Sequence, residues 1–523
     1  MKRELVVLIN PGHDEDVDPE IARSMGARQR TVSREDPPVS ILNLGAYIRD
    51  KGYDVRILDT HVEPDYKRIL KDLIKEKPLA IGLSVILGKF TKNAIAITMM
   101  INETAPEIPV VWGGKLVHLA AELILEELPV DYVIIGEGEL SFFTLLDALR
   151  KGQKPKDIPG FGYKEAGKQV INRNFVYAED LDSIYTSEDF GWDLIKDRVN
   201  YRQVPYFINL YTSRGCKYNC SFCYLKDIKQ VKAVLRYRRR SPENVIKEIE
   251  YLNRNFGINV FTFGDDDFLY DLKKVAPVLE HIKQKGYYIE HIWTNINNLK
   301  PETIELLKGI CQTVCYSIET VSPRLQKILR KVIPAERVIE TNRLLRKSGI
   351  NTVHNFMFGV PTERDEETKL NIDLMKRLKE INPFVRANCY ILSPIPGTPI
   401  FSYAEKLADK PIQWSLDDLA KFHFRYMKES AAKFRPYLTL EDNIFYERAT
   451  VLANELFTEL NVPAVAKQIA EIEGSRRLKF IFGDISGIPY PIINDKVMDR
   501  KYILDKVLRA KDEGRQMPMI EPF

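Results

Sequence analysis

The chain has 523 residues, of which 45% are apolar and 29% are charged, which is the balance of a globular protein with a large core. Its formal net charge of +4 is too small over this length to indicate a nucleic-acid partner. No apolar stretch reaches the ~18 residues of a membrane span, so we predict no transmembrane segment, and the length predicts two to four domains.

The first ten residues briefly imitate a signal peptide. Pro11–Asp14 ends the apolar run too early for one, so we interpret Leu5–Asn10 as a first strand. Without an export signal, and with cysteines kept reduced, the chain is expected to be cytoplasmic.

Residues 1–165 alternate short apolar runs with amphipathic segments. The expected strands are Leu5–Asn10, Val55–Asp59, Ala80–Val85, Val110–Trp112 and Tyr132–Ile135. The expected helices between them include Ser40–Lys51, Tyr66–Glu76 and Ala120–Leu128. This alternation predicts an α/β domain with a doubly wound parallel sheet.

Loops that contain glycine follow three of these strands, at Gly82–Val85, Trp112–Lys115 and Gly136–Glu139. Ligands bind beyond the carboxyl ends of parallel strands, and glycines let a large flat ligand approach the backbone. Each glycine could equally serve only to make a tight turn. Lys115 and His118 follow the second loop, where contact with such a ligand and plain exposure are both open interpretations.

Residues 166–204 contain many turn formers and predict a linker before a second domain at 205–415. The expected strands there are Phe207–Thr212, Val260–Gly264, Tyr288–Asn295, Thr313–Ile318, Asn351–Phe358 and Arg386–Leu392. The expected helices include Pro242–Asn255, Pro301–Ile310, Ala335–Lys347 and Glu366–Ile381. Six strand–helix units fall short of the eight in a closed barrel, so we predict a partial (β/α)6 barrel.

Three cysteines follow the first strand of this barrel, at Cys216, Cys220 and Cys223. Four-iron clusters of the ferredoxin type have four thiolate ligands, so three thiolates leave one iron open, as catalytic metal sites do. The alternative is a zinc site with Cys311 and Cys315 as a second pair. Because those two residues have the pattern of a buried strand, we predict an iron–sulfur cluster.

Polar residues end several of the other barrel strands. They include Asp265, Asp266, Thr294, Ser317 and Glu319, and a glycine–proline turn begins at Gly359. In a parallel barrel these ends lie on the same face as the cysteine loop. The acids that follow Gly264 could instead cap a helix.

Two further segments carry less information. The basic run Arg236–Arg240 directly precedes a helix cap at Ser241, which indicates a solvated turn rather than a nucleic-acid site. Residues 416–523 predict a mainly helical segment in which we find no motif.

The cysteine motif resembles that of the radical S-adenosylmethionine superfamily. The resemblance implies a [4Fe–4S] cluster on Cys216, Cys220 and Cys223, with S-adenosylmethionine chelated to the open iron and Phe222 near the adenine. One electron from the cluster then yields a 5′-deoxyadenosyl radical, which abstracts a hydrogen atom. The resemblance further implies S-adenosylmethionine contacts for the following residues: Asp265, Asp266, Thr294, Ser317, Glu319 and Gly359. An arginine of the basic run could reach its carboxylate.

The glycine loops of the first domain resemble the cobalamin-binding domain of one subgroup of that superfamily. The resemblance implies cobalamin contacts for the following residues: Ser84, Val85, Gly113, Gly114, Gly136 and Glu137. Asp59-Thr-His61 only approaches the motif whose histidine ligates cobalt, because Pro64 stands where a glycine belongs. We therefore expect cobalamin without a protein imidazole beneath cobalt.

The resemblance implies a cobalamin-dependent radical S-adenosylmethionine enzyme, and within it we expect methyl transfer to an unactivated carbon. A ring-forming or oxidative enzyme of the same subgroup is the alternative, and a non-catalytic metal- or cobalamin-binding protein is a third. The expected partners are a small-molecule or lipid-like substrate, which no motif names, and an external electron donor of the flavodoxin or ferredoxin type. A C-terminal cover over the substrate cavity is also implied.

Overall fold

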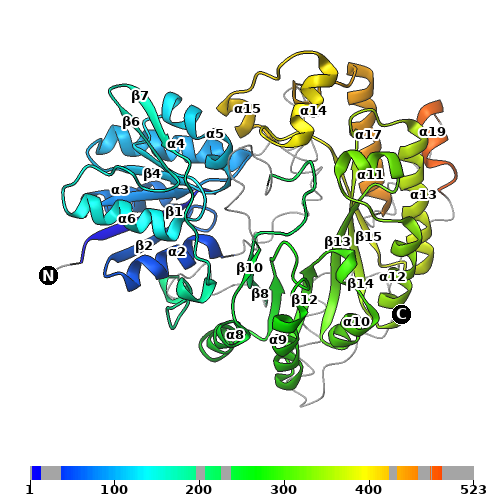
Figure 1. The fold of residues 1–523 in the computed structure, drawn as a ribbon, viewed down its shortest axis with the longest axis horizontal. Helices are drawn as coiled ribbons and strands as arrows, with labels where there is room; N and C mark the ends of the chain where they lie inside the picture. Colours follow the sequence, from blue (N-terminus) through cyan, green and yellow to red (C-terminus); the bar gives the residue numbers. More distant parts are fainter. Residues whose placement is uncertain are drawn as a thin grey trace.

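The computed structural model describes residues 3–12, 37–195, 207–224, 237–422, 433–457, 471–472 and 474–485. A seven-stranded sheet forms the first domain, at the left of Figure 1, and a six-stranded sheet forms the second, drawn mainly in green. The predicted start of the second domain at residue 205 lies outside the described residues. Within those residues, no helix has both the length and the apolar character needed to cross a membrane.

The first sheet is parallel over five strands and ends in an antiparallel hairpin. Its strands are β1 (Leu5–Asn10), β2 (Asp54–Asp59), β3 (Ala80–Ser84), β4 (Val110–Gly113), β5 (Tyr132–Ile134), β6 (Phe161–Glu165) and β7 (Lys168–Asn172). Their order is β2-β1-β3-β4-β5-β6-β7, so the direction of winding reverses between β1 and β3. In such sheets the ligand crevice lies at this switch point. Strand β7 continues the sheet past residue 165.

Helices cover both faces of this sheet. They are α2 (Val39–Asp50) and α6 (Gly138–Arg150) on one face, and α3 (Tyr66–Lys75), α4 (Lys89–Thr104) and α5 (Lys115–Glu127) on the other. Strand β1 is buried on both sides, because Val6 and Leu8 join the core with α2 and α6 while Val7 and Ile9 join the opposite core. This explains its continuous apolar sequence.

The second sheet is a half-open barrel whose strands follow chain order. They are β8 (Phe207–Leu210), β11 (Val260–Phe263), β12 (Tyr288–Trp293), β13 (Cys311–Glu319), β14 (Asn351–Phe358) and β15 (Arg386–Ile391), all parallel to their neighbours. The helices are α8 (Pro242–Phe256), α9 (Leu272–Lys285), α10 (Pro301–Leu307), α11 (Pro323–Leu329), α12 (Ala335–Lys347) and α13 (Asp365–Ile381). A short pair of strands, β9 (Ser213–Arg214) and β10 (Arg238–Arg239), follows β8 on either side of the cysteine loop.

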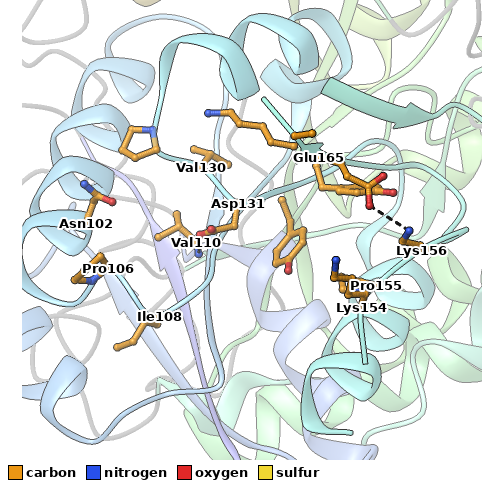
Figure 2. A pocket seen from close by; sticks show the side chains of 15 residues that line it. Asn102, Pro106, Ile108, Val110, Val130, Asp131, Lys154, Pro155, Lys156 and Glu165 are labelled. Atoms are coloured by element: carbon orange, nitrogen blue, oxygen red, sulfur yellow. Dashed lines mark hydrogen bonds and ion pairs between the residues drawn. The ribbon is translucent and has the colours of Figure 1, made fainter. Parts of the chain in front are cut away.

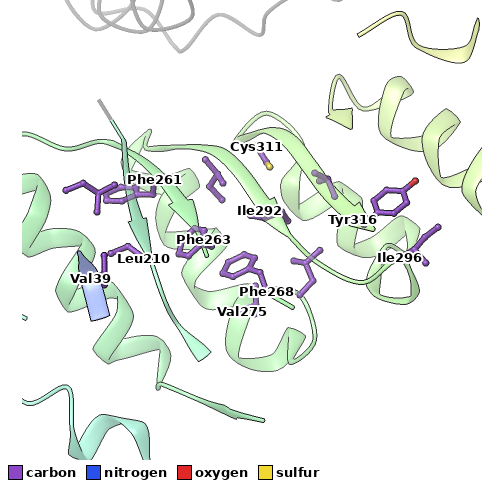
Figure 3. Close-up of a cluster of buried hydrophobic side chains, with 14 of the residues drawn as sticks. Val39, Leu210, Phe261, Phe263, Phe268, Val275, Ile292, Ile296, Cys311 and Tyr316 are labelled. Carbon is purple, nitrogen blue, oxygen red and sulfur yellow. The ribbon is translucent and has the colours of Figure 1, made fainter. Parts of the chain in front are cut away.

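One apolar core runs through this barrel and into the first domain. Phe263 stacks on Phe268 with ring centroids 4.2 Å apart, and both pack near Val275 of α9 (Figure 3). Val39 of α2 belongs to the same core cluster. The two domains therefore share buried apolar surface.

The C-terminal segment contacts both domains. Helix α14 (Pro399–Ala408) comes before it, and the helices described within it are α15 (Leu416–Ala420), α17 (Leu440–Phe457) and α19 (Arg476–Phe482). Helix α15 packs on α4 and α5 of the first domain, as Figure 1 shows at the top, and Gly88 N donates a hydrogen bond to Leu419 O at 3.0 Å. Helix α17 covers the edge strand β15, where the Asn454 side chain bonds both the N–H and the C=O of Cys389 at 2.8 Å. An amide thus occupies an edge that would otherwise be open to strand pairing.

Candidate functional site

The cysteine loop lies at the carboxyl end of β8 and is tied to the end of α11. Cys216, Cys220 and Cys223 are half-buried and form no disulfide bond. Ser221 N donates to Leu329 O at 3.0 Å, and Ser221 Oγ donates to Ile328 O at 2.7 Å. The loop is therefore anchored to α11 at Ser221, between two of the cysteines, through backbone carbonyl acceptors.

The donor set fits an iron–sulfur cluster better than zinc. In the part of the chain that the structure describes, no three His, Cys, Asp or Glu side chains converge on a point where one ion could sit. Zinc needs its ligands within ~2.3 Å of a single centre, whereas the thiolates of a cubane each bind a different iron. Cys311 and Cys315 are buried in β13, and burial raises the pKa of the Cys311 thiol to about 12. Both thiols thus belong to the buried strand that the sequence predicts there.

Two of the three acids after β11 hold strand ends together. Asp265 accepts a hydrogen bond from Thr212 Oγ1 at 2.8 Å and another from Ser213 Oγ. Asp267 accepts from Thr294 Oγ1 at 2.7 Å and from Asn298 Nδ2 at 2.8 Å. The predicted residues Asp265 and Thr294 are therefore both engaged in these internal bonds.

Asp266, the middle acid, faces the first domain. Burial raises the pKa of its carboxyl, and the nearby ammonium of Lys115 opposes that rise. Lys115 also lies with its Nζ 5.1 Å from the ring centroid of Tyr224, the residue after Cys223. Burial lowers the pKa of Lys115, but its interactions with Tyr224 and Asp266 outweigh burial and leave the pKa above its ordinary value. The exposed Lys115 side chain therefore links the second glycine loop to the cysteine loop.

The carboxyl ends of β13 and β14 bring the remaining predicted residues to the same face. Ser317 Oγ accepts from Asn355 Nδ2 at 3.1 Å, and Glu319 is paired with Lys331 at 2.9 Å. Glu319 has φ +67°, a left-handed conformation that strains a residue other than glycine. Gly359 has φ +68°, and its carbonyl accepts from Tyr437 of the C-terminal segment at 2.9 Å.

Phe222 packs against a small apolar cluster next to the cysteines. The cluster consists of Leu325, Leu329, Val360, Leu392 and Ile400, which come from α11, α14 and the loops after β14 and β15. An aromatic ring on an apolar shelf beside the cluster loop fits the flat face of a purine. The structure thus brings Phe222 and the turn after Gly359 to one place, and their contact with S-adenosylmethionine stays a prediction.

The glycine loops line a pocket of about 560 Å³ between the two domains. Five of the six residues predicted to contact cobalamin line it: Ser84, Gly113, Gly114, Gly136 and Glu137. Val85 does not, because it is fully buried and its backbone bonds Gly113 and Leu116. A Cβ on Gly113 would have no neighbour closer than 4.0 Å, whereas one on Gly114, at φ +92°, would lie 2.7 Å from Val85 O.

The chemistry of this pocket fits cobalamin. From the barrel side the pocket is lined by Asn209, Tyr211, Ser213 and Arg214. The buried Asn209 Oδ1 has no hydrogen-bond partner among the described residues. Corrin side chains end in amides, whose N–H groups would satisfy such an acceptor. The individual cobalamin contacts stay predictions.

His118 supports the third glycine loop from inside. Its Nε2 accepts a hydrogen bond from Gly136 N at 3.1 Å. Burial lowers the pKa of His118 to about 4, so the ring is neutral and can accept this bond near neutral pH. His118 is thus neither exposed nor a pocket-lining residue.

Buried ion pairs join the pocket to the cysteine loop. Arg214, two residues before Cys216, donates to both oxygens of Glu139 at 2.6 and 3.1 Å and lies 3.4 Å from Glu137. Arg238 donates to Glu137 at 3.0 Å. The sequence analysis missed Arg214 and Glu139, whose only signal is opposite charge next to two predicted ligand loops.

The prediction of a solvated turn at Arg236–Arg240 was wrong. Arg238, Arg239 and Arg240 are all buried. Arg239 donates to Phe268 O at 2.5 Å and to Thr212 Oγ1 at 2.9 Å, and Arg240 pairs with Glu248 at 2.5 Å. Arg236 lies outside the described residues. The acceptors lie in other elements, at Thr212, Phe268 and Glu248, so the run resembles a surface segment when it is read alone.

A second pocket, of about 420 Å³, lies at the opposite end of the first sheet (Figure 2). It is lined by Pro106, Val110 and Asp131 near the amino ends of β4 and β5, and by Lys156, which pairs with Glu165. Asp131 accepts a hydrogen bond from Val110 N at 2.8 Å. This pocket contains none of the predicted site residues.

Models of two families match the chain, one for the radical SAM superfamily over residues 210–375 and one for a B12 binding domain over residues 30–146. An uncharacterized methyltransferase from Pyrococcus horikoshii is 30% identical over 446 residues, which are 82% of this chain and 92% of that protein. An anaerobic magnesium-protoporphyrin IX monomethyl ester cyclase from Cereibacter sphaeroides is 25% identical over 74% of this chain and 62% of its own length.

A solved structure has a similar fold. It is TsrM, a radical S-adenosylmethionine methyltransferase from Kitasatospora setae with cobalamin and a [4Fe–4S] cluster bound. Its TM-score is 0.63 at 19% identity, and the match covers 84% of this chain and 92% of that one.

Proposed function

The chain belongs to the cobalamin-dependent radical S-adenosylmethionine enzymes, and we propose that it transfers a methyl group to an unactivated carbon of a small-molecule or lipid-like substrate. Its cofactors are a [4Fe–4S] cluster, S-adenosylmethionine and cobalamin. When bound, the cluster and cobalamin supply the electron that cleaves S-adenosylmethionine and the methyl group that is transferred. The protein's task is to hold these groups and to exclude water.

One observation carries the proposal: the glycine-loop pocket and the cysteine loop are adjacent at the interface between the two domains. Arg214 lines the pocket and precedes Cys216 by two residues. Lys115 lines the same pocket and lies against Tyr224, which follows Cys223. An enzyme that moves a one-carbon group between two cofactor sites needs them fixed at short range, because reacting atoms must be pre-positioned.

Named residues would hold each group. The sulfurs of Cys216, Cys220 and Cys223 would hold three irons, and Phe222 with Val360 would pack on the adenine. The residues with free space above their backbone, Gly113 foremost, would let the corrin approach.

Asp266, Ser317 and Glu319 would orient the ribose and the methionine end of S-adenosylmethionine. Asp265 and Thr294 would contribute indirectly, because their hydrogen bonds hold the strand ends in place.

The product of the reaction tests this proposal directly. With S-adenosylmethionine carrying a labelled methyl group, methyl transfer predicts label in the product. Label-free product would favour ring formation or oxidation, for which the 25% identity to a cyclase is the supporting observation. A non-catalytic cobalamin or metal binder would release no 5′-deoxyadenosine after anaerobic reduction.

The metal assignment has its own test. Cys220→Ala should lose most of the iron and the broad brown absorbance after anaerobic reconstitution. Cys315→Ala removes a thiol of the same type from β13 and should keep the iron content of the wild type. Equal loss in both variants would contradict the assignment.

Location and reductant are part of the proposal. Cysteines without disulfide bonds support a reducing compartment, for which we propose the cytoplasm. Each reductive cleavage consumes one electron, so the enzyme needs a donor, and we propose a flavodoxin- or ferredoxin-type protein.

A further inference from the structure

A basic, partly apolar surface lies directly behind the cysteine loop, and it is formed by the exposed side chains of Lys327, Arg330 and Val332. We call it the α11 patch. It is next to the cysteines because Ser221, between Cys220 and Phe222, bonds the carbonyls of Ile328 and Leu329. The patch and the loop therefore share a backbone connection, and few bonds separate its surface from the predicted cluster.

The charge of this segment is one-sided. The sequence holds four cations and no acid between Glu319 and Glu336. Two of the cations are paired with acids, Lys331 with Glu319 at 2.9 Å and Arg324 with Glu367 at 3.1 Å. Lys327 and Arg330 are exposed, so two cationic side chains reach the surface of the patch. The exposed Glu336, at the start of α12, is the first acid after it.

Arg330 occupies a position that suits glycine. It ends α11 with φ +53°, the left-handed conformation in which helices usually carry glycine. The Cβ of an arginine strains the backbone in this conformation. The backbone therefore favours glycine here, and the reason for an arginine at this position is its charged side chain. Val332, two residues on, is 67% exposed. An exposed apolar side chain flanked by cations is typical of a protein contact rather than of a phosphate-binding surface.

We propose that the α11 patch is the docking surface for an acidic electron-carrier protein of the flavodoxin type, an inference that rests on the proposed function. The carrier gives up one electron and the oxidised cluster accepts it, with no bond made or broken and no proton moved. Positive charge would steer an acidic carrier, and Val332 would be covered on contact. The small net charge of +4 favours such a local protein contact over a nucleic acid.

The test measures how fast the reconstituted holoenzyme is reduced. Fully reduced flavodoxin and photoreduced deazariboflavin, an uncharged small donor, are each mixed with wild type, Arg330→Gly and Lys327→Glu. At low ionic strength the flavodoxin rate constant should fall about tenfold in either variant, and the rate should depend less on salt. The deazariboflavin rate should be unchanged. Lys71→Glu, the same charge change on α3 of the first domain, should leave both rates as in the wild type.

Arg330→Gly separates docking from folding. Glycine suits the left-handed position, so this variant should melt at the wild-type temperature or above it while it loses the flavodoxin rate. Variants reduced by flavodoxin as fast as Lys71→Glu would overturn the proposal. So would an unchanged flavodoxin rate in variants that bind a tRNA probe more weakly than the wild type in a gel-shift assay, because the patch would then contact nucleic acid. Failure of deazariboflavin to yield any 5′-deoxyadenosine in the wild type would instead refute the proposed function.

Discussion

Replacing Glu139 by glutamine should make the interface between the two domains less stable. The Glu139 side chain is only 6% exposed and its partner Arg214 is 21% exposed, so the pair is largely out of water. Burial raises the pKa of the Glu139 carboxyl, but the charge and hydrogen bonds of Arg214 outweigh burial and leave the pKa below its ordinary value. Glutamine keeps the shape and one acceptor but removes the charge.

The expected cost follows from the charge left behind. Breaking a buried pair by removing one partner costs ~3–5 kcal/mol. Arg214 retains Glu137 at 3.4 Å, which places this case at the lower end, about 3 kcal/mol. That free energy corresponds to a roughly 100-fold larger population of molecules in which the interface between the two domains has opened.

Limited proteolysis of the native protein measures this population, because cleavage between the domains requires opening. Glu139→Gln should be cut on the order of 100 times faster. Glu122→Gln breaks a pair with Arg173 in which the glutamate is 52% exposed, and should cost under ~1 kcal/mol. Similar cleavage rates for the two variants would refute the reasoning.

The same pair has a pH signature. Because the folded pKa of Glu139 is depressed, its contribution is complete above the ordinary glutamate pKa and is lost as the pH falls through the folded value. Wild type and Glu139→Gln should therefore become alike only in acid below the depressed folded pKa of Glu139, which cleavage by pepsin would show.

Three other outcomes are expected. Gly114→Ala should weaken cobalamin binding about tenfold or more in equilibrium titration, because its Cβ would lie 2.7 Å from Val85 O. Gly152→Ala is the control: Gly152 also has a positive φ but faces open space, so this variant should bind cobalamin as the wild type does. Desolvation raises the pKa of Glu363 to about 7, so wild type should lose up to about 3 kcal/mol of stability between pH 5 and pH 8 relative to Glu363→Gln in urea unfolding. Lys115→Met should lower the melting temperature slightly by removing an exposed cation–π contact worth about 0.5–1 kcal/mol, and Lys115→Arg should retain most of it.

Much of the fold follows from local pattern. The strands Leu5–Asn10 and Asn351–Phe358 and the helix Ala335–Lys347 have the bounds that the sequence predicts, because apolar periodicity and capping residues are local signals. The hairpin β6–β7 was not predicted. It is an edge element with mostly exposed side chains in β7, so burial imposes little alternation on its sequence.

The candidate site was predictable in position but not in its division of labour. Asp265 and Asp266 are neighbours of the same type at one strand end, yet Asp265 bonds Thr212 and Ser213 while Asp266 faces Lys115. Partners that lie more than 50 residues away decide such roles, and a single sequence does not reveal them. The wrong prediction for Arg238 has the same reason, because its acid Glu137 lies 101 residues away.

Arg238 makes the two domains of this enzyme poor candidates for exchange between proteins. A guanidinium stays protonated at every physiological pH. Arg238 finds its acid, Glu137, in the other domain. A barrel grafted onto a foreign partner would keep that cation under cover with nothing to neutralise it, so a working chimera has to carry the acid across together with the arginine.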